Sequence, residues 1–253
     1  MLDGTTYYFT AFALDSDNNI LDTVTNSVTT DFGWHVTPNT LLYMPLKNDF
    51  VDYSLNPCTI STNSISYTTV WWVQSVHLWS TWWWKLTTPY PLQSDATKPI
   101  TISVLIYVTA SQISSRRNIV EFAATNGNRI FFCIRENTSN IQYQSTQWDT
   151  IYADLTTPVI ANSRMHIVVT WTTSSTKLYV NGELKATWNW NSKPRWNRPY
   201  SRDNSQWIFN KRDVNNYTTS LQWNARELIM EEVEWNASFI ASYYNKIKAQ
   251  LWF

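Results

Sequence analysis

The chain carries tryptophan at positions where a protein normally carries glycine. Its 253 residues include 16 Trp and only 4 Gly, whereas average usage would make about 7% of the residues Gly. Several Trp lie in runs that resemble turns, at 70–73, 81–85 and 187–191. A tight turn with positive φ favours Gly or Asn, and a Trp ring there is sterically poor. The pattern constrains both the turns that the chain can form and the surface that it presents.

Two interpretations of these residues are open. Genuine Trp would form an exposed aromatic surface for a ligand. Alternatively, the source reads the UGA codon as glycine and many of these Trp are misread glycines; Gly and Trp together make 20 residues, near the normal Gly share plus a few Trp. We predict that most of seven Trp residues occupy turns or strand edges, with a positive φ or a largely exposed ring. They are Trp71, Trp72, Trp82, Trp83, Trp84, Trp188 and Trp190.

The remaining composition indicates a strand-rich protein. β-branched and aromatic residues dominate the apolar set, and 19 positive and 19 negative residues give a formal net charge of zero. This balance implies no general attraction to nucleic acid or to an acidic membrane. There is no apolar run of membrane-spanning length and no signal-peptide pattern. We expect a soluble protein with no nucleic-acid partner and no membrane insertion, exported, if at all, by something outside this chain.

Two cysteines, Cys58 and Cys133, are present. Cys133 lies in the apolar run 130–134, typical of a buried strand, and predicts a buried free thiol. A disulfide between the two remains an alternative, since sequence cannot test its geometry. Two isolated cysteines do not indicate a metal site.

The first 31 residues predict a β-hairpin. Residues 6–14 and 20–30 have strand patterns, and the cluster 15–19 is a turn signal. The stretch around Tyr7 resembles the last strand pair of a fibronectin type III domain, in which Tyr7 would be the corner tyrosine. Because a lone hairpin is marginally stable, either the chain begins inside a longer protein or the hairpin docks on the next domain. We assign residues 1–33 to this fibronectin type III-like hairpin or linker and residues 36–253 to a second domain.

The second domain shows recurring strands and one terminal helix. Asn181 and Gly182 form the strongest hairpin signal and suit a type I′ turn. Residues 238–251 show helical periodicity, with Asn236 or Ser238 as the cap. This pattern indicates a β-sandwich of jelly-roll type. The strands are predicted at 101–108, 118–123, 129–135, 165–171, 177–180 and 183–187.

Four stretches in order resemble the concanavalin A-like, laminin G-like lectin superfamily: 41–54, 100–108, 166–182 and 231–236 with the following helix. The resemblance implies an all-β, concanavalin A-like jelly-roll β-sandwich with one short C-terminal helix. Trp171 and Trp235 fall at aromatic positions of the family pattern and are predicted core residues. Trp188, Trp190 and Trp207 instead fall where relatives carry glycine.

The resemblance also raises a catalytic function, because related jelly rolls include glycoside hydrolases, which use two carboxylates. Glu232 and Glu234 form the best pair, since strand alternation puts them on one side. The segment lacks the central Asp of the hydrolase signature, so we predict a solvated strand face and no catalytic residue. The three histidines lie in separate stretches, and His166 is predicted to be structural.

Two further candidate sites would bind a metal ion or a ligand without catalysing a reaction. Asp49 and Asp52 offer oxygen ligands for calcium, although Asp is also common in turns. The loop 187–206 combines aromatic rings that stack on sugars with groups that hydrogen-bond hydroxyls or anions; an ordinary solvated loop is its alternative. The candidate ligand-binding residues are Trp188, Trp190, Arg195, Trp196, Arg198, Tyr200 and Arg202.

The leading functional hypothesis is a non-catalytic glycan-binding or adhesion module of a phage virion (tail or fibre) or bacterial surface protein. Its partner would be a glycan or cell-surface polysaccharide, and its location extracellular, on a cell surface or on a virion. The alternative is a structural or assembly subunit of an extracellular filament or capsid decoration, which self-associates through the hairpin. A glycoside hydrolase is the third hypothesis.

Overall fold

The computed structural model divides into two compact units, Met1–His35 and Val36–Leu251. Each unit has its own sheet structure and is described by itself. The residues that the structure describes are 6–29, 36–46, 49, 51–62, 66–70, 73–78, 84–86, 98–110, 117–123, 128–135, 140–147, 150–189, 205–208 and 223–251.

The first unit is an antiparallel hairpin of β1 (Thr6–Leu14) and β2 (Ile20–Thr29). Asp15 closes its turn, because its carboxylate accepts hydrogen bonds from the Asp17 and Asn19 backbone N–H groups at 2.8 and 2.9 Å. Asp and Asn favour such turns for this reason. The predicted hairpin is confirmed.

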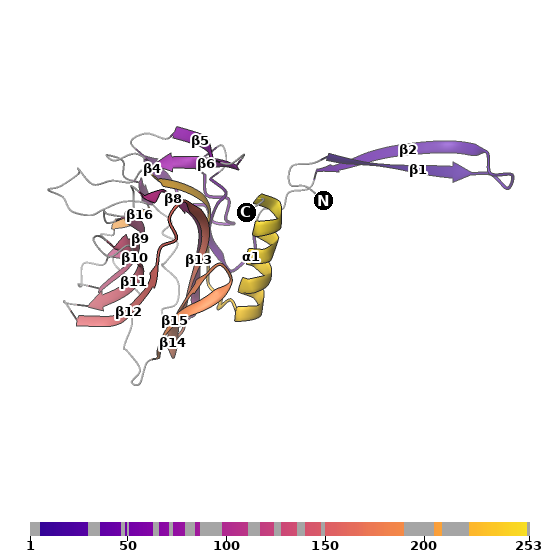
Figure 1. Cartoon of the computed structure of the whole chain (residues 1–253). Helices are drawn as coiled ribbons and strands as arrows, with labels where there is room; N and C mark the ends of the chain where they lie inside the picture. The colour runs from indigo at the N-terminus through magenta and orange to yellow at the C-terminus, as the bar shows by residue number, and fades with distance from the viewer. Residues whose placement is uncertain are drawn as a thin grey trace. The chain divides into compact units, whose positions relative to one another are not determined.

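The second unit is a sandwich of two antiparallel sheets (Figure 1). The seven-stranded sheet runs in spatial order β12 (Thr150–Pro158), β11 (Asn140–Gln147), β10 (Asn128–Arg135), β9 (Arg117–Ala123), β16 (Ser205–Ile208), β7 (Trp84–Leu86) and β4 (Ile60–Thr62). The eight-stranded sheet runs β15 (Glu183–Asn189), β14 (Ser175–Val180), β13 (Ser163–Trp171), β8 (Ile100–Val108), β17 (Trp223–Glu231), β6 (Val73–Leu78) and β5 (Ser66–Val70), and β3 (Thr40–Met44) pairs with β17. This arrangement confirms the predicted concanavalin A-like sandwich.

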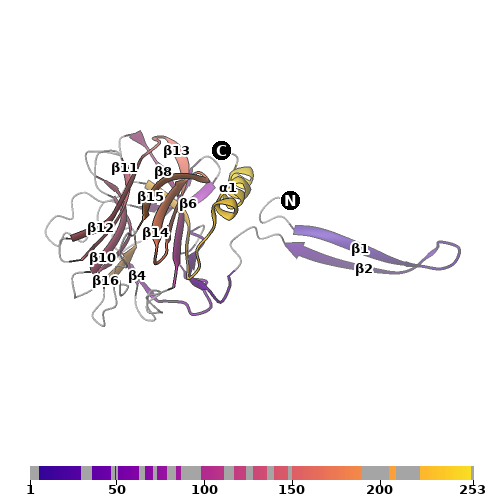
Figure 2. The ribbon, with the colours of Figure 1, turned by 90° about the horizontal axis from the view of Figure 1, so that it is seen from below.

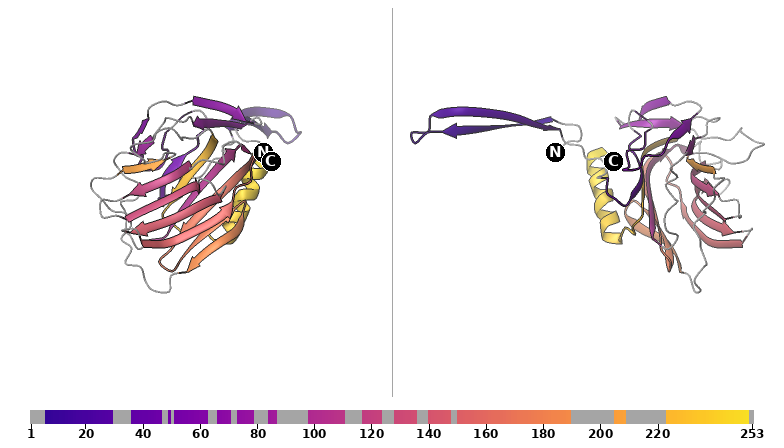
Figure 3. Two further views of the ribbon diagram at one scale, coloured as in Figure 1. Left: turned by 60° about the vertical axis from the view of Figure 1, so that its left-hand side comes forward. Right: turned by 180° about the vertical axis from the view of Figure 1, so that it is seen from behind.

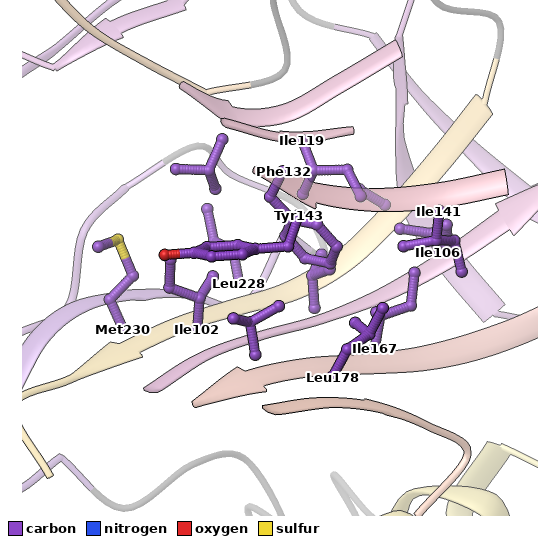
Figure 4. Packing of buried hydrophobic residues seen from close by; sticks show 14 of the residues in the cluster. Ile102, Ile106, Ile119, Phe132, Ile141, Tyr143, Ile167, Leu178, Leu228 and Met230 are labelled. Atoms are coloured by element: carbon purple, nitrogen blue, oxygen red, sulfur yellow. The ribbon is translucent and has the colours of Figure 1, made fainter. Parts of the chain in front are cut away.

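The main core fills the space between the two sheets (Figure 4). Strand alternation supplies it, since Ile102, Val104 and Ile106 of β8 point inward while the residues between them point to the other face. From the opposite sheet, Phe132 and Tyr143 reach the same cluster and are almost completely buried. The large buried aromatic side chains close the gap between the layers.

The helix α1 (Ala237–Leu251) covers the outer face of the eight-stranded sheet (Figures 1 and 2). Asn236 caps the helix, because its Oδ1 accepts the Phe239 backbone N–H at 2.9 Å, which confirms a predicted cap. The helix buries Ile240, Tyr243 and Ile247. A second apolar layer therefore lies between this sheet and the helix.

The type I′ turn at Asn181 and Gly182 connects β14 to β15 as predicted, with φ of 53° and 81°. Gly182 is required here, because a Cβ atom would lie 3.2 Å from Ala241 Cα and 3.2 Å from Tyr244 Cδ1 of the helix. The positive φ and the close approach of α1 both favour glycine.

The expectation that seven Trp residues occupy turns or edges does not hold at Trp84, which begins β7 between β4 and β16. Trp207, which falls where relatives carry glycine, lies in the strand β16. Trp188 lies at the edge, on β15, and is 39% exposed, as expected. None of the described Trp residues has a positive φ, so the steric argument for glycine does not apply to them. Trp71, Trp72, Trp82, Trp83 and Trp190 lie outside the described residues.

The predicted core residues Trp171 and Trp235 are buried, at 6% and 4% exposure. The predicted closing strand at 231–236 is wrong, because β17 ends at Glu231. Beyond this point the Thr101 side chain forms hydrogen bonds with the backbone. Its Oγ1 donates to the Val233 carbonyl at 2.6 Å and accepts from the Trp235 N–H at 3.0 Å. The Thr101 side chain therefore helps to hold the segment between β17 and α1, which is not part of a strand.

Candidate functional site

The predicted ligand loop is described only at its two ends, at 187–189 and 205–206, and Trp188 lies on β15, the edge strand of the eight-stranded sheet. Its cross-strand neighbour is Thr176, which also pairs with the buried Trp171. The exposed ring at this edge is available for stacking on a sugar. Trp190, Arg195, Trp196, Arg198, Tyr200 and Arg202 lie outside the described residues, and their role stays a prediction.

The predicted calcium ligands form hydrogen bonds within the protein. Asp52 is 3% exposed, and its carboxylate accepts the backbone N–H groups of Tyr43, Ser54 and Cys58 at 2.8 to 3.1 Å and the Ser54 hydroxyl at 3.0 Å. The Asp49 carboxylate accepts the Tyr53 hydroxyl. The described residues contain no group of three or more His, Cys, Asp or Glu suited to a metal. Calcium binding stays a prediction.

The cysteines are both buried and are not joined by a disulfide. Burial, followed by the nearby Asp52 carboxylate, raises the pKa of the Cys58 thiol well above its ordinary value. A thiol with a raised pKa is a poor nucleophile and a poor metal ligand.

The candidate carboxylate pair is not arranged as the sequence suggested. Glu232 and Glu234 follow the end of β17 and do not share a strand face. Each instead pairs with a lysine: Glu232 with Lys98 at 2.7 Å and Glu234 with Lys177 at 2.8 Å. Their contacts tie the β17–α1 connection to the segment before β8 and to β14.

A different carboxylate, Glu231, is buried at 3% exposure. Its Oε1 accepts the hydroxyls of Thr37 and Thr40 at 3.2 and 2.9 Å, and its Oε2 accepts the Trp235 indole N–H at 2.8 Å. The contacts join the start of the domain to its end, so Glu231 has a structural role.

His166 is buried at 1% exposure beneath α1. Its Nε2 lies 2.8 Å from Ser103 Oγ, and burial lowers its pKa from 6.5 to about 3. The side chain is therefore a neutral imidazole at neutral pH, as its predicted structural role requires.

The register of the seven-stranded sheet aligns aromatic and polar residues that come from different strands. Leu155, Tyr143 and Phe132 belong to the core, so their strand neighbours lie on the opposite face. The view in Figure 3, left, looks onto this sheet from the side away from α1. The cross-strand register places seven residues in one line, here called the outer row: Asp154, Gln144, Phe131, Glu121, Trp207, Lys85 and Ser61.

Two described side chains next to this outer row are buried. Gln142 and Cys133 belong to the outer face, yet they are only 4% and 0% exposed. The Gln142 amide donates to Asp154 Oδ1 at 2.6 Å, which fixes the position of a carboxylate in the row. Polar groups fixed in this way give ligand sites their specificity.

The sequence alone does not reveal this outer row, because its members come from seven strands. The available signal is that Phe131 and Phe132 are consecutive in a predicted strand, which predicts opposite faces for them. The pairing of β16 with β9 and β7, which brings Trp207 between Glu121 and Lys85, requires the tertiary register.

Residues 85–224, more than half of the chain, match the family described as the Concanavalin A-like lectin/glucanases superfamily. The chain belongs to this superfamily. The match excludes the N-terminal hairpin, so the resemblance of that hairpin to fibronectin type III stays a prediction. Comparison of this lectin/glucanase superfamily member with curated proteins finds no match.

Solved structures similar to this superfamily member are toxin binding domains. The receptor binding domain of botulinum neurotoxin mosaic serotype C/D matches with a TM-score of 0.64 and 16% identity, over 82% of this chain and 50% of that one. The binding domain of Paraclostridial Mosquitocidal Protein 1 matches with a TM-score of 0.66 and 15% identity, over 83% and 52%.

A structure of botulinum neurotoxin type C, whose cell entry is described as dependent upon interaction with two ganglioside molecules, matches with a TM-score of 0.62 and 15% identity, over 83% of this chain and 51% of that one. The chain thus spans about half the length of the structures that it matches. At these identities the likeness establishes the fold.

Proposed function

We propose that this chain is a non-catalytic module that binds glycans on a cell surface. The observation that carries the proposal is the outer row, where Trp207 and Phe131 lie in register with Glu121, Lys85 and Gln144. Aromatic faces stack on sugar rings, and carboxylate, amide and ammonium groups bind hydroxyls. The hydrogen bond from the buried Gln142 to Asp154 fixes acceptor groups in the outer row.

The similarity to solved structures also supports a glycan-binding function. The matched structures are receptor binding or binding domains, and one toxin among them is described as dependent upon interaction with gangliosides. A fold does not by itself define a function, so the glycan class remains open to experiment. We place the module on a virion tail or fibre, or on a bacterial surface protein, where extracellular carbohydrate is accessible.

A glycan array with the purified 253-residue chain, with and without calcium, tests the proposal. We expect binding to a limited set of glycans, because a defined row of groups selects its partners. The matched variants Trp207→Ala and Trp188→Ala separate the two candidate surfaces. Loss of at least tenfold in affinity in the first variant assigns binding to the outer row, and loss in the second assigns it to the β15 edge. An array with no bound glycan contradicts the proposal.

The alternative function, assembly, is favoured by a specific observation on the hairpin. Tyr8, Phe12, Leu21 and Val24 are 55% to 74% exposed, and a two-stranded ribbon is marginal without a partner. Size-exclusion chromatography of the full chain and of a chain lacking residues 1–33 tests this. Self-association that disappears on truncation supports assembly, and a monomer in both cases contradicts it.

The hydrolase alternative rests on the glucanases in the superfamily name. Glu232 and Glu234 pair with separate lysines, and this arrangement favours a structural role for both. Hydrolysis of an array glycan that disappears in Glu232→Gln or Glu234→Gln would restore the alternative.

A further inference from the structure

His166 occupies the boundary between the eight-stranded sheet and the C-terminal helix. It lies on β13, and its ring centroid is 5.6 Å from that of Tyr243 and 6.3 Å from that of Tyr244, both on α1. The Tyr244 ring is nearly parallel to the imidazole, and the Tyr243 ring is inclined at 63°. The helix therefore covers the histidine with two aromatic rings.

The polar contacts of the ring suit the neutral form only. Nε2 lies 2.8 Å from Ser103 Oγ, whereas Nδ1 is buried and has no hydrogen-bond partner. We assign the proton to Nε2, which donates to Ser103 and leaves Nδ1 as a bare acceptor. A second proton would create a buried N–H without an acceptor and a buried positive charge, and both are costly.

The neighbouring arginines do not favour a histidinium. Arg164, on the same strand face two residues earlier, is itself disfavoured as a cation by burial and by Arg226, which lower its pKa. Burial lowers the pKa of His166 to about 3. The groups that face this region from the surrounding elements are Arg164 of β13, Ser103 and Tyr107 of β8, Arg226, Glu227 and Glu231 of β17, Tyr43 of β3, Tyr179 of β14, Glu183 of β15, and Tyr243, Tyr244 and Lys248 of α1.

The β14–β15 turn couples the histidine to the helix. The His166 backbone N–H donates to Asn181 Oδ1 at 2.9 Å, and the Asn181 N–H donates to the His166 carbonyl at 2.8 Å. The next residue, Gly182, lies against Ala241 and Tyr244. The backbone of His166 therefore holds the turn on which the helix rests, while its imidazole contacts the helix directly through Tyr243 and Tyr244.

We propose that His166 makes the docking of α1 on the eight-stranded sheet sensitive to pH, so that acidification releases the helix while the sandwich stays folded. The helix is joined to β17 only through residues 232–236, and the main core between the sheets contains no residue of α1. Its release breaks no pairing between strands. The released helix exposes Ile240, Tyr243 and Ile247, and the sheet exposes Leu105 and Val168.

The sign of the effect follows from the two states of the histidine. With α1 undocked, His166 is exposed and has its ordinary pKa of 6.5; with α1 docked, its pKa is about 3. The undocked state binds more protons between these values, so docking is strongest above pH 6.5 and weakens as the pH falls below it. The docking equilibrium constant falls about fivefold from pH 6.5 to 5.5, and its fall approaches tenfold per pH unit below that.

Hydrogen exchange of the full chain, followed by mass spectrometry between pH 7.5 and 5.0, tests the proposal. We expect the protection factors of α1 amides, corrected for intrinsic exchange, to fall about 30-fold between pH 7.5 and 5.0. Amides of β8 and β13 keep their protection. The window ends at pH 5.0 because ordinary carboxylates titrate below it.

Two variants identify the titrating group. His166→Phe keeps an aromatic ring between the helix and the sheet but cannot titrate, and its α1 protection is expected to be constant. The double variant His35→Gln/His77→Gln leaves His166 as the one histidine and is expected to retain the full dependence, which keeps the test valid if His166→Phe does not fold. Constant α1 protection in the wild type, an equal fall in His166→Phe, or an equal fall in β8 and β13 overturns the proposal.

Discussion

Glu231 accepts a 2.8 Å hydrogen bond from the indole N–H of Trp235, four residues later, and both side chains are buried. The same carboxylate accepts the hydroxyls of Thr37 and Thr40 near the start of the domain. The pair therefore fixes the exit from β17 toward α1 against β3 and the segment before it. It also explains why an acidic residue is retained in an apolar environment, since its acceptors are used by three donors.

Removal of this carboxylate should destabilise the domain. In Glu231→Ala three donors lose their buried acceptor, and unsatisfied buried groups cost roughly 1–3 kcal/mol each, with relaxation reducing the sum. We expect the free energy of unfolding to fall by about 3 kcal/mol in urea denaturation. The matched variant Glu234→Ala, which removes a partly exposed ion pair with Lys177, is expected to cost less than about 1 kcal/mol. Equal losses contradict the structural role of Glu231.

Asp52 should stabilise its turn without calcium. Four donors occupy its carboxylate, so Asp52→Ala is expected to lower the free energy of unfolding by about 2–3 kcal/mol. We expect the same Tm in EDTA and in millimolar calcium, because a ligand stabilises only what it binds. A calcium-dependent rise in Tm that is lost in Asp49→Asn establishes the predicted calcium site instead.

The cysteines should be reduced and unreactive in the folded protein. Both are buried and are not joined to each other, and burial raises the pKa of the Cys58 thiol. We expect a thiol reagent to modify neither cysteine in native buffer and both in denaturant, without prior reduction. Two thiols that appear only after reduction would establish the disulfide alternative.

Gly182→Ala should loosen the helix. The new Cβ would lie 3.2 Å from Ala241 Cα, at a residue with φ of 81°, so the cost combines backbone strain with displacement of α1. We expect a loss of stability of about 1–2 kcal/mol and faster hydrogen exchange in α1. Asn189→Ala, at the far end of β15, is the control, and an unchanged α1 in Gly182→Ala argues against the close contact.

The buried and exposed Trp residues should respond differently to glycine. Trp171→Gly and Trp235→Gly remove rings that are 6% and 4% exposed, and we expect each to cost about 3–5 kcal/mol. Trp188→Gly, at an exposed edge, should cost much less. Peptide sequencing of protein from its native source separates misread glycine from genuine Trp, and both interpretations require Trp at 171 and 235.

Local sequence determined much of the sandwich. Alternation predicted β8 and β13, the Asn181–Gly182 pair predicted the turn between β14 and β15, and helical spacing with a capping Asn236 predicted α1. These features depend on residues close together in the chain, whose conformational preferences are visible without the fold. The short strands β4, β7 and β16 were missed, because three or four residues carry too little periodicity.

Tertiary structure decided the rest, because pairing between distant strands has no local signature. It placed Glu231 in the core and gave Glu232 and Glu234 separate lysines, although the sequence treats them as one acidic run. It also brought Trp207 between Glu121 and Lys85 and covered His166 with α1. The sequence by itself determined the fold class through short-range patterns, while the candidate site and the buried histidine depend on register and packing across the whole domain.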